Sequence, residues 1–166
     1  RSPAPPFTTS TLQQDASRRF NFQTKKTMKA AQELYEGVDV AGFGLVGLIT
    51  YMRTDSLRIS DDAALKAKSF IIERYGNEYY PAKRRYYKTK KGAQDAHEAI
   101  RPTNLELTPE TVKSSLSNDQ YKLYKLIYER FIASQMSDVV YDTMSSDLSD
   151  GKYVFKTNSQ SVKFKG

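Results

Sequence analysis

The chain of 166 residues contains no cysteine and a single histidine. Without cysteine there is no disulfide framework and no zinc site of the Cys type, and one histidine cannot form a His-rich metal cluster. No apolar run is long enough to span a bilayer, and the first residues are not a charged segment followed by an apolar one, as in a signal peptide. We therefore expect an intracellular protein that contacts no membrane.

The charged residues are predominantly positive, with 26 Lys and Arg against 19 Asp and Glu and a net charge of +7. A basic surface favours polyanionic partners, because phosphate contacts release counterions. The densest basic segment also contains tyrosines at positions 79, 80, 86 and 87, and its cations are Lys83, Arg84, Arg85, Lys88, Lys90 and Lys91. Since aromatic rings stack on unpaired bases while cations follow the phosphates, we interpret this irregular loop as DNA-binding. A solvated basic loop is an equally good interpretation.

Residues 1–137 are predicted to form a mainly α-helical domain. Ser10 with Gln13 is a capping-box pattern before a helix that runs to about residue 20, and a second helix is expected from a cap at Thr24 to a stop at Gly37. The two helices form a helix-turn-helix-like pair. The glycine-rich residues 37–48 suggest a loop or short hairpin acting as a wing, which indicates a winged-helix-like (CAP-like) fold.

Three further helices follow. Ser60 caps a helix that ends at Gly76, Thr108 caps a brief helix with proline in its first turn, and Ser117 with Gln120 opens a long helix that ends near residue 136. Tyrosines recur along one face of the long helix, and we expect this stripe to lie in the core.

From residue 139 the hydrophobic period becomes strand-like, and Asp150-Gly151 is a hairpin turn signal. Alternation resumes at residues 153–155, and residues 162–164 are expected to begin another strand. We interpret residues 138–166 as the β-strand stub of an adjoining domain, and the chain as an excised piece of a longer protein.

Residues 49–56 (ITYMRTDS) contain the strongest chemical signal. Their β-branched and aromatic start predicts the end of a strand, in which Tyr51 and Arg53 would point to the same face. A phenol can attack phosphorus if it is activated from its ordinary pKa of about 10, and a guanidinium matches the geometry of a phosphate. Spacing alone favours a simpler interpretation, in which a half-buried strand tyrosine stands beside a solvated arginine.

His97 lies in the run 95–103 (DAHEAIRPT), where residues 95–100 are expected to open a short helical turn. A histidine here can donate a hydrogen bond to a phosphate. It can equally be a neutral, packed residue.

Three runs of the chain resemble motifs of the type IA DNA topoisomerases and occur in the family's order. Residues 6–14 (PFTTSTLQQ) are similar to the segment that leads into the active-site domain. Residues 32–36 (QELYE), a glycine-rich spacer and residues 48–56 resemble the active-site signature, and residues 95–103 resemble the histidine motif. The resemblance covers essentially the whole chain, and the residues around His97 fit the bacterial topoisomerase I branch.

The resemblance implies a function for this site. Tyr51 would attack single-stranded DNA and become joined to its 5′ phosphate, while Arg53 and His97 would contact the scissile phosphate. The phosphotyrosine bond retains the energy of the phosphodiester, so the enzyme would pass a strand, reseal without ATP and relax negatively supercoiled DNA. A cytoplasmic, nucleoid-associated enzyme is expected.

The resemblance also implies a part that this chain lacks. Members of the family bind Mg²⁺ through acidic residues of a Toprim domain, which include an Asp-x-Asp-x-Glu cluster. No such cluster occurs here. We therefore expect the chain to bind no metal or cofactor, to depend on the remaining domains of the same polypeptide, and to be inactive in isolation.

Two other functions fit parts of the sequence. The first is a non-catalytic winged-helix module that binds nucleic acid, in which Tyr51 is a structural strand residue. The second is a tyrosine recombinase, which fits less well because such enzymes surround the nucleophile with several Arg and His residues.

Overall fold

The computed structural model describes residues 1–88 and 97–166. In these ranges the helices are α1 (Thr9–Phe20), α2 (Thr24–Glu36), α3 (Asp61–Tyr75), α4 (Pro109–Val112) and α5 (Asn118–Gln135), with short 3₁₀ turns η1 (Asn77–Tyr79) and η2 (Lys113–Ser115). The strands are β1 (Val38–Val40), β2 (Gly44–Val46), β3 (Val140–Ser149) and β4 (Val154–Phe164). The predicted mainly α-helical class with a C-terminal hairpin is confirmed. No helix in the described ranges has the length and apolar character needed to cross a bilayer.

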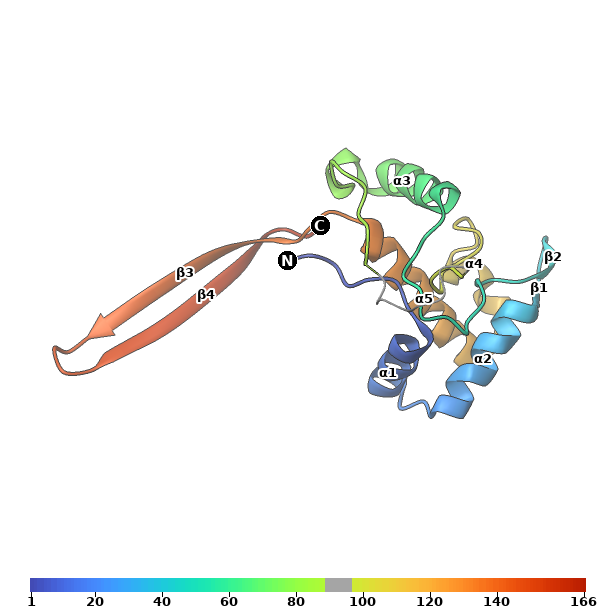
Figure 1. The fold of residues 1–166 in the computed structure, drawn as a ribbon, viewed down its shortest axis with the longest axis horizontal. Coiled ribbons are helices and arrows are strands. Elements are labelled where there is room, and N and C mark those ends of the chain that lie inside the picture. Colours follow the sequence, from blue (N-terminus) through green and yellow to red (C-terminus); the bar gives the residue numbers. More distant parts are fainter. Residues whose placement is uncertain (89–96) are drawn as a thin grey trace.

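Helix α5 is the centre of the helical body and packs against α1, α2, α3 and α4 (Figure 1). Of its predicted tyrosine stripe, Tyr124 and Tyr128 are buried as expected, whereas Tyr121 is only partly buried and its hydroxyl donates to the carboxylate of Glu110 at 2.7 Å. The hydroxyl of Tyr124 donates to the carbonyl of Leu107 at 2.6 Å, and that of Tyr128 donates to the carbonyl of Leu105 at 2.6 Å. These bonds satisfy the polar ends of large rings in the core, as burial requires. The largest fully buried side chains are Tyr124, Phe7, Phe131, Leu12, Leu34, Leu48, Ile49, Met52, Ile71, Ile100, Leu107 and Leu123.

Local capping signals determine most helix starts. Ser60, Thr108 and Ser117 cap α3, α4 and α5 through their side chains, as predicted. The predicted start of α1 at Ser10 is wrong, because Thr8 is extended and its hydroxyl accepts from the backbone of Thr11. Thr8 therefore supplies the cap two residues earlier.

The start of α2 also differs from the prediction. Thr24 is the first helical residue, and the cap position is occupied by Gln23, which makes no capping bond through its side chain. The end of the helix at Gly37 is as predicted.

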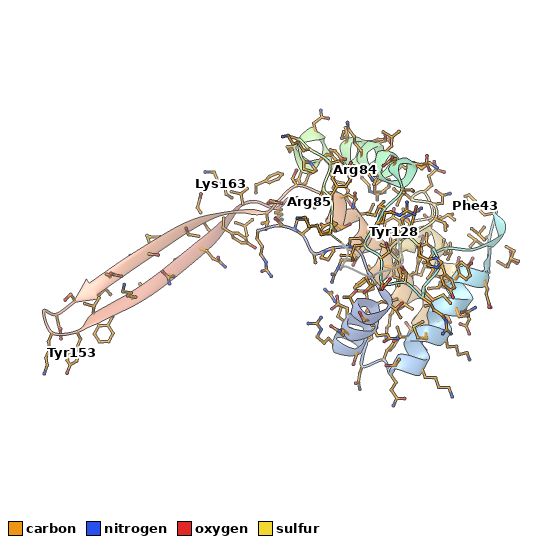
Figure 2. The ribbon with its side chains drawn as sticks, in the orientation of Figure 1. Phe43, Arg84, Arg85, Tyr128, Tyr153 and Lys163 are labelled. Atoms are coloured by element: carbon orange, nitrogen blue, oxygen red, sulfur yellow. The ribbon has the colours of Figure 1, made fainter. Side chains whose placement is uncertain are left out.

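The glycine-rich segment after α2 is the short antiparallel hairpin β1–β2, in which Val38 pairs with Val46. Gly42 and Gly44 have positive φ angles that a tight turn needs and that other residues rarely adopt. Phe43 between them is 54% exposed and lies at the edge of the molecule (Figure 2). The prediction of a short hairpin is confirmed.

Strands β3 and β4 form a long antiparallel arm that projects from the helical body, with both chain termini at its base (Figure 1). The turn lies at the predicted Asp150-Gly151, and Tyr153 marks the far end of the arm (Figure 2). A separate strand beginning at residue 162 is a wrong prediction. Val162 pairs with Tyr141 and Phe164 with Val140, so residues 154–164 are one strand that returns along the whole of β3.

Candidate functional site

Tyr51 lies where three segments, distant in sequence, meet. Phe7 forms an antiparallel bridge with Ile100, and Ile49 forms one with Pro102. The bridged residues are almost fully buried, and the backbone N–H of Ile100 donates to the carbonyl of Phe7 at 2.8 Å. The segments 6–14, 48–56 and 97–103 are therefore neighbours in space.

Hydrogen bonds hold the backbone on both sides of Tyr51. Before it, the N–H of Thr50 donates to the carbonyl of Arg101 at 2.9 Å, and the Thr50 hydroxyl donates to that of Ala99 at 2.8 Å. After it, the hydroxyl of Thr9 donates to the carbonyl of Met52 at 2.7 Å and accepts from the N–H of Thr54 at 2.9 Å. Thr9 begins α1, so the first helix anchors the segment that carries Tyr51.

The predicted strand around Tyr51 is wrong, since Ile49 makes only an isolated bridge and residues 50–60 form no strand. In an antiparallel pair the partner of Tyr51 would be Ile100, but the N–H of Ile100 donates to the carbonyl of Phe7, so the pairing does not continue past Thr50. Exposure nevertheless alternates, with Met52 and Thr54 buried. Tyr51, which is 37% exposed, and Arg53 thus share the solvent side, as the spacing predicted.

The ring of Tyr51 lies between two other rings. Its centroid is 5.4 Å from that of Tyr35 at an interplanar angle of 65°, and 5.6 Å from that of His97 at 41°. His97 is half-buried, and it follows directly on residues 89–96, which lie outside the described ranges. The structure therefore brings the histidine of one run against the tyrosine of another.

The segment that carries His97 is extended and is held by an ion pair. One carboxylate oxygen of Glu98 accepts from the backbone N–H of Ser60 at 3.1 Å, and the other accepts from Nε of Arg101 at 2.7 Å. Both side chains are largely covered, with 19% and 15% exposed. The predicted helical turn is wrong for residues 97–100. The backbone N–H groups of Ala99 and Ile100 donate to the carbonyls of Arg58 and Phe7, and not to carbonyls one turn earlier in the same segment.

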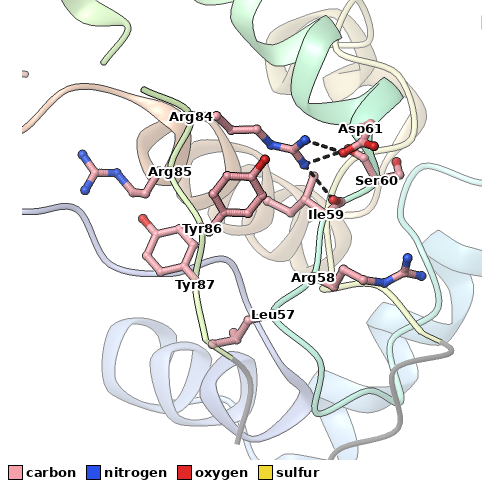
Figure 3. A pocket seen from close by; sticks show the side chains of 9 residues that line it. All are labelled: Leu57, Arg58, Ile59, Ser60, Asp61, Arg84, Arg85, Tyr86 and Tyr87. Atoms are coloured by element: carbon pink, nitrogen blue, oxygen red, sulfur yellow. Dashed lines mark hydrogen bonds and ion pairs between the residues drawn. The ribbon is translucent and has the colours of Figure 1, made fainter. Parts of the chain in front are cut away.

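The basic segment divides into two kinds of residue. The side chains of Lys83 and Lys88 are exposed, whereas the guanidinium of Arg84 pairs with Asp61 and donates to the carbonyl of Ile59 at 3.0 Å. Figure 3 shows this contact in a pocket of about 400 Å³, with Arg85 pointing the other way.

Arg85 has a structural environment of its own. Its guanidinium donates to the carbonyl of Met136 at 3.2 Å and pairs with the carboxylate of Asp138. The hydrogen bond from Arg85 lowers the pKa of the Asp138 carboxyl. Tyr87 beside it donates to the carbonyl of Ser134 at 2.9 Å, and burial raises its pKa to about 12. The remaining predicted cations, Lys90 and Lys91, lie outside the described residues.

The arrangement is suited to chemistry on a phosphate. Tyr51 presents its phenol to solvent, and the guanidinium of Arg53 has no hydrogen bond or ion pair with any other residue that the structure describes. A guanidinium on the same side of the chain and an imidazole against the ring of Tyr51 can stabilise an anion that is bound at its phenol. Across residues 1–88 and 97–166, no three acidic, histidine or cysteine residues are grouped so as to hold a metal ion.

The sequence did not identify three residues that shape this site: Thr9, Tyr35 and Glu98. Each lies within one of the runs quoted above, so the runs were the available signal. Their individual roles depend on partners from other segments.

Comparison with known proteins gives two findings. A protein-family model described as DNA topoisomerase matches residues 1–166. A solved structure of full-length topoisomerase I from Thermotoga maritima is 45% identical in sequence, with a TM-score of 0.85. The match covers 98% of this chain and 26% of that protein, so this chain spans about a quarter of its length.

Proposed function

Because the chain belongs to the bacterial type IA DNA topoisomerases, we propose that it carries the nucleophile of such an enzyme, Tyr51. The phenol oxygen attacks a phosphodiester of single-stranded DNA and forms a bond to phosphorus. The bond from phosphorus to the 3′ oxygen breaks, the phenol loses its proton and the 3′ hydroxyl gains one. The 5′-phosphotyrosine retains the energy of the phosphodiester, so the 3′ hydroxyl reverses the reaction without ATP after a strand has passed.

The observation that carries this proposal is the position of Tyr51. Its ring is accessible, lies 5.6 Å from that of His97, and shares the solvent side with an unpaired Arg53 in the described structure. A tyrosine with only a packing role would not need an imidazole against its ring and an unpaired guanidinium on the same side of the described chain.

We assign Arg53 and His97 to the scissile phosphate. Charge builds up on the non-bridging oxygens as the phenol attacks, and the planar guanidinium can donate two parallel hydrogen bonds to them. The imidazole can donate a third. Both groups act through positions set by the backbone contacts of Thr50, Thr9 and Glu98, so little reorganisation is needed during reaction.

The basic segment is proposed to contribute to binding of single-stranded or negatively supercoiled DNA. Lys83 and Lys88 are the exposed cations through which it would contact phosphates, and the exposed ring of Tyr86 can stack on a base. Arg84 and Arg85 are already paired with carboxylates and would contribute less. The α1–α2 pair with the β1–β2 hairpin is proposed to act as a winged-helix-like unit.

The chemistry of the whole enzyme requires parts outside this chain. The described residues do not offer a metal site, so we propose that Mg²⁺ is held by acidic residues of a Toprim domain elsewhere in the polypeptide. Residues 1–137 would form the tyrosine domain, and residues 138–166 would belong to an adjoining domain. An enzyme of this kind would act on chromosomal DNA, and we therefore propose that it is associated with the nucleoid.

The test is a Tyr51→Phe variant of the intact enzyme, which loses only the nucleophilic oxygen. Wild-type enzyme incubated with Mg²⁺ and end-labelled single-stranded DNA should yield a denaturation-resistant adduct, and Tyr51→Phe should yield none. Tyr75→Phe is the matched control, because Tyr75 is similarly exposed and contacts the ring of Tyr79.

Two outcomes would contradict the proposal. An adduct that persists in Tyr51→Phe assigns the nucleophile elsewhere, and DNA binding without any adduct in the wild type favours a non-catalytic winged-helix module. The isolated chain should bind single-stranded DNA weakly and form no adduct, because positioning requires all groups together.

A further inference from the structure

Tyr35 supplies the second aromatic ring in contact with Tyr51. The packing of its own helix does not explain why a tyrosine occupies this position. It lies in the last turn of α2 and is 40% exposed, while its neighbour Leu34 is fully buried and supplies the packing of that turn. The hydroxyl of Tyr35 makes no hydrogen bond within the described part of the chain, unlike the hydroxyls of Tyr124 and Tyr128. Its ring contact is with Tyr51.

The backbone enforces this contact. After the β1–β2 hairpin, the chain returns across the end of α2, where the N–H of Leu48 donates to the carbonyl of Leu34 at 2.7 Å. Gly47 passes so close that an added Cβ would lie 2.6 Å from the carbonyl oxygen of Tyr35. Since real Cβ atoms do not approach backbone oxygen so closely, glycine is required here, and the distance between Tyr35 and the segment leading to Tyr51 is set by direct backbone contact.

The two rings meet edge to face, with an interplanar angle of 65°. This geometry places the positive edge of one ring against the negative face of the other and favours one relative orientation. A tyrosine side chain that is partly exposed would otherwise exchange between rotamers. With His97 as the other neighbour, Tyr35 restricts the directions in which the phenol can point.

We propose that Tyr35 is a positioning residue for the nucleophile: its ring holds the Tyr51 phenol in the orientation that attacks the phosphate. The inference rests on the proposed function, since it assigns Tyr35 a role in the same reaction. Tyr35 acts through Tyr51 and takes no proton or phosphate itself. The ring carries this role and the hydroxyl does not.

The test compares Tyr35→Phe and Tyr35→Leu in the intact enzyme, with Tyr75→Leu as the control for loss of an exposed ring that does not touch Tyr51. Single-turnover adduct formation and the Kd for single-stranded DNA are measured separately. Tyr35→Leu should slow adduct formation about tenfold, the equivalent of losing one aromatic pair, while the Kd changes little. Tyr35→Phe should keep the wild-type rate, and Tyr75→Leu should too.

A spectroscopic measurement reports orientation without catalysis. 3-Fluorotyrosine placed at position 51 should show a changed ¹⁹F shift and narrower line in Tyr35→Leu, because a less restricted ring averages its environments, and an unchanged spectrum in Tyr75→Leu. Thermal unfolding of the same variants identifies any loss of folding.

The outcomes separate this inference from the function on which it rests. If Tyr51→Phe abolishes the adduct but Tyr35→Leu reacts at the wild-type rate with an unchanged ¹⁹F spectrum, the positioning role is wrong and the proposed function stands. A loss of rate in Tyr35→Phe equal to that in Tyr35→Leu would also overturn the inference, since it would assign the effect to the hydroxyl. An adduct that persists in Tyr51→Phe overturns the proposed function itself.

Discussion

Replacing Thr9 by alanine tests whether α1 anchors the segment that carries Tyr51. The hydroxyl of Thr9 donates to the carbonyl of Met52 and accepts from the N–H of Thr54, at 2.7 and 2.9 Å. Thr54 is only 7% exposed, so water cannot readily replace the lost acceptor. The backbone bond from the N–H of Thr9 to the carbonyl of Thr54 remains in the variant.

The magnitude follows from these two bonds. A net loss of about 1 kcal/mol for each bond, with a further penalty for a buried N–H left unpaired, gives a cost of about 2–3 kcal/mol. Alanine is the better helix former, and its helix propensity offsets up to about 0.7 kcal/mol of this loss of stability at the first helical position. The net loss of about 2 kcal/mol corresponds to a fall in Tm of roughly 4–8 °C for a chain of this length.

The assay is thermal unfolding of the 166-residue chain, with Thr9→Ser as the matched control because it keeps the hydroxyl. Thr9→Ser should lie close to the wild type, and in the intact enzyme only Thr9→Ala should slow adduct formation. A Tm for Thr9→Ala equal to or above that of the wild type would refute the reasoning, since helix propensity would then outweigh the two bonds.

Three further predictions follow from the described contacts. Arg53→Lys should slow adduct formation by the intact enzyme about tenfold, because an ammonium keeps the charge but loses the planar two-point contact; a wild-type rate would show that geometry at this position is unimportant. Replacing Lys83 and Lys88 together by glutamine should weaken binding of single-stranded DNA and lower the slope of log Kd against log salt by about 1.4, whereas an unchanged slope would identify a solvated loop. Burial raises the pKa of Tyr87 and of Tyr128 to about 12, above the value of about 10 expected in the unfolded chain, so the folded state binds more protons in this range. Their contribution to stability should be complete below about pH 10 and be lost as the pH rises through 12, a decline that urea unfolding would detect and that phenylalanine at both positions would reduce.

The local features of the chain could be predicted because their causes lie within a few residues. The caps at Ser60, Thr108 and Ser117 and the turn at Asp150 each depend on bonds that span three residues or fewer. The errors arise where a distant contact decides between two local alternatives. Thr8 and Ser10 are both good caps, and the choice between them depends on where Thr9 contacts residues 52 and 54.

The single strand over residues 154–164 illustrates a second limit. Polar residues interrupt its hydrophobic alternation, and the sequence therefore suggested two strands. Pairing with β3 continues through the polar part, since ladder hydrogen bonds involve the backbone and not the side chains.

The sequence by itself determined the helical class, the C-terminal hairpin, the family and the shared solvent side of Tyr51 and Arg53. Only the tertiary structure decided which side chains surround that tyrosine. The bond from Thr9 to Met52 spans 43 residues, and the ion pairs of Arg84 and Arg85 span 23 and 53. Contacts of this length form only when the core has packed, because no local pattern specifies the partner. The rings of Tyr35 and His97 likewise reach Tyr51 from other segments of the chain.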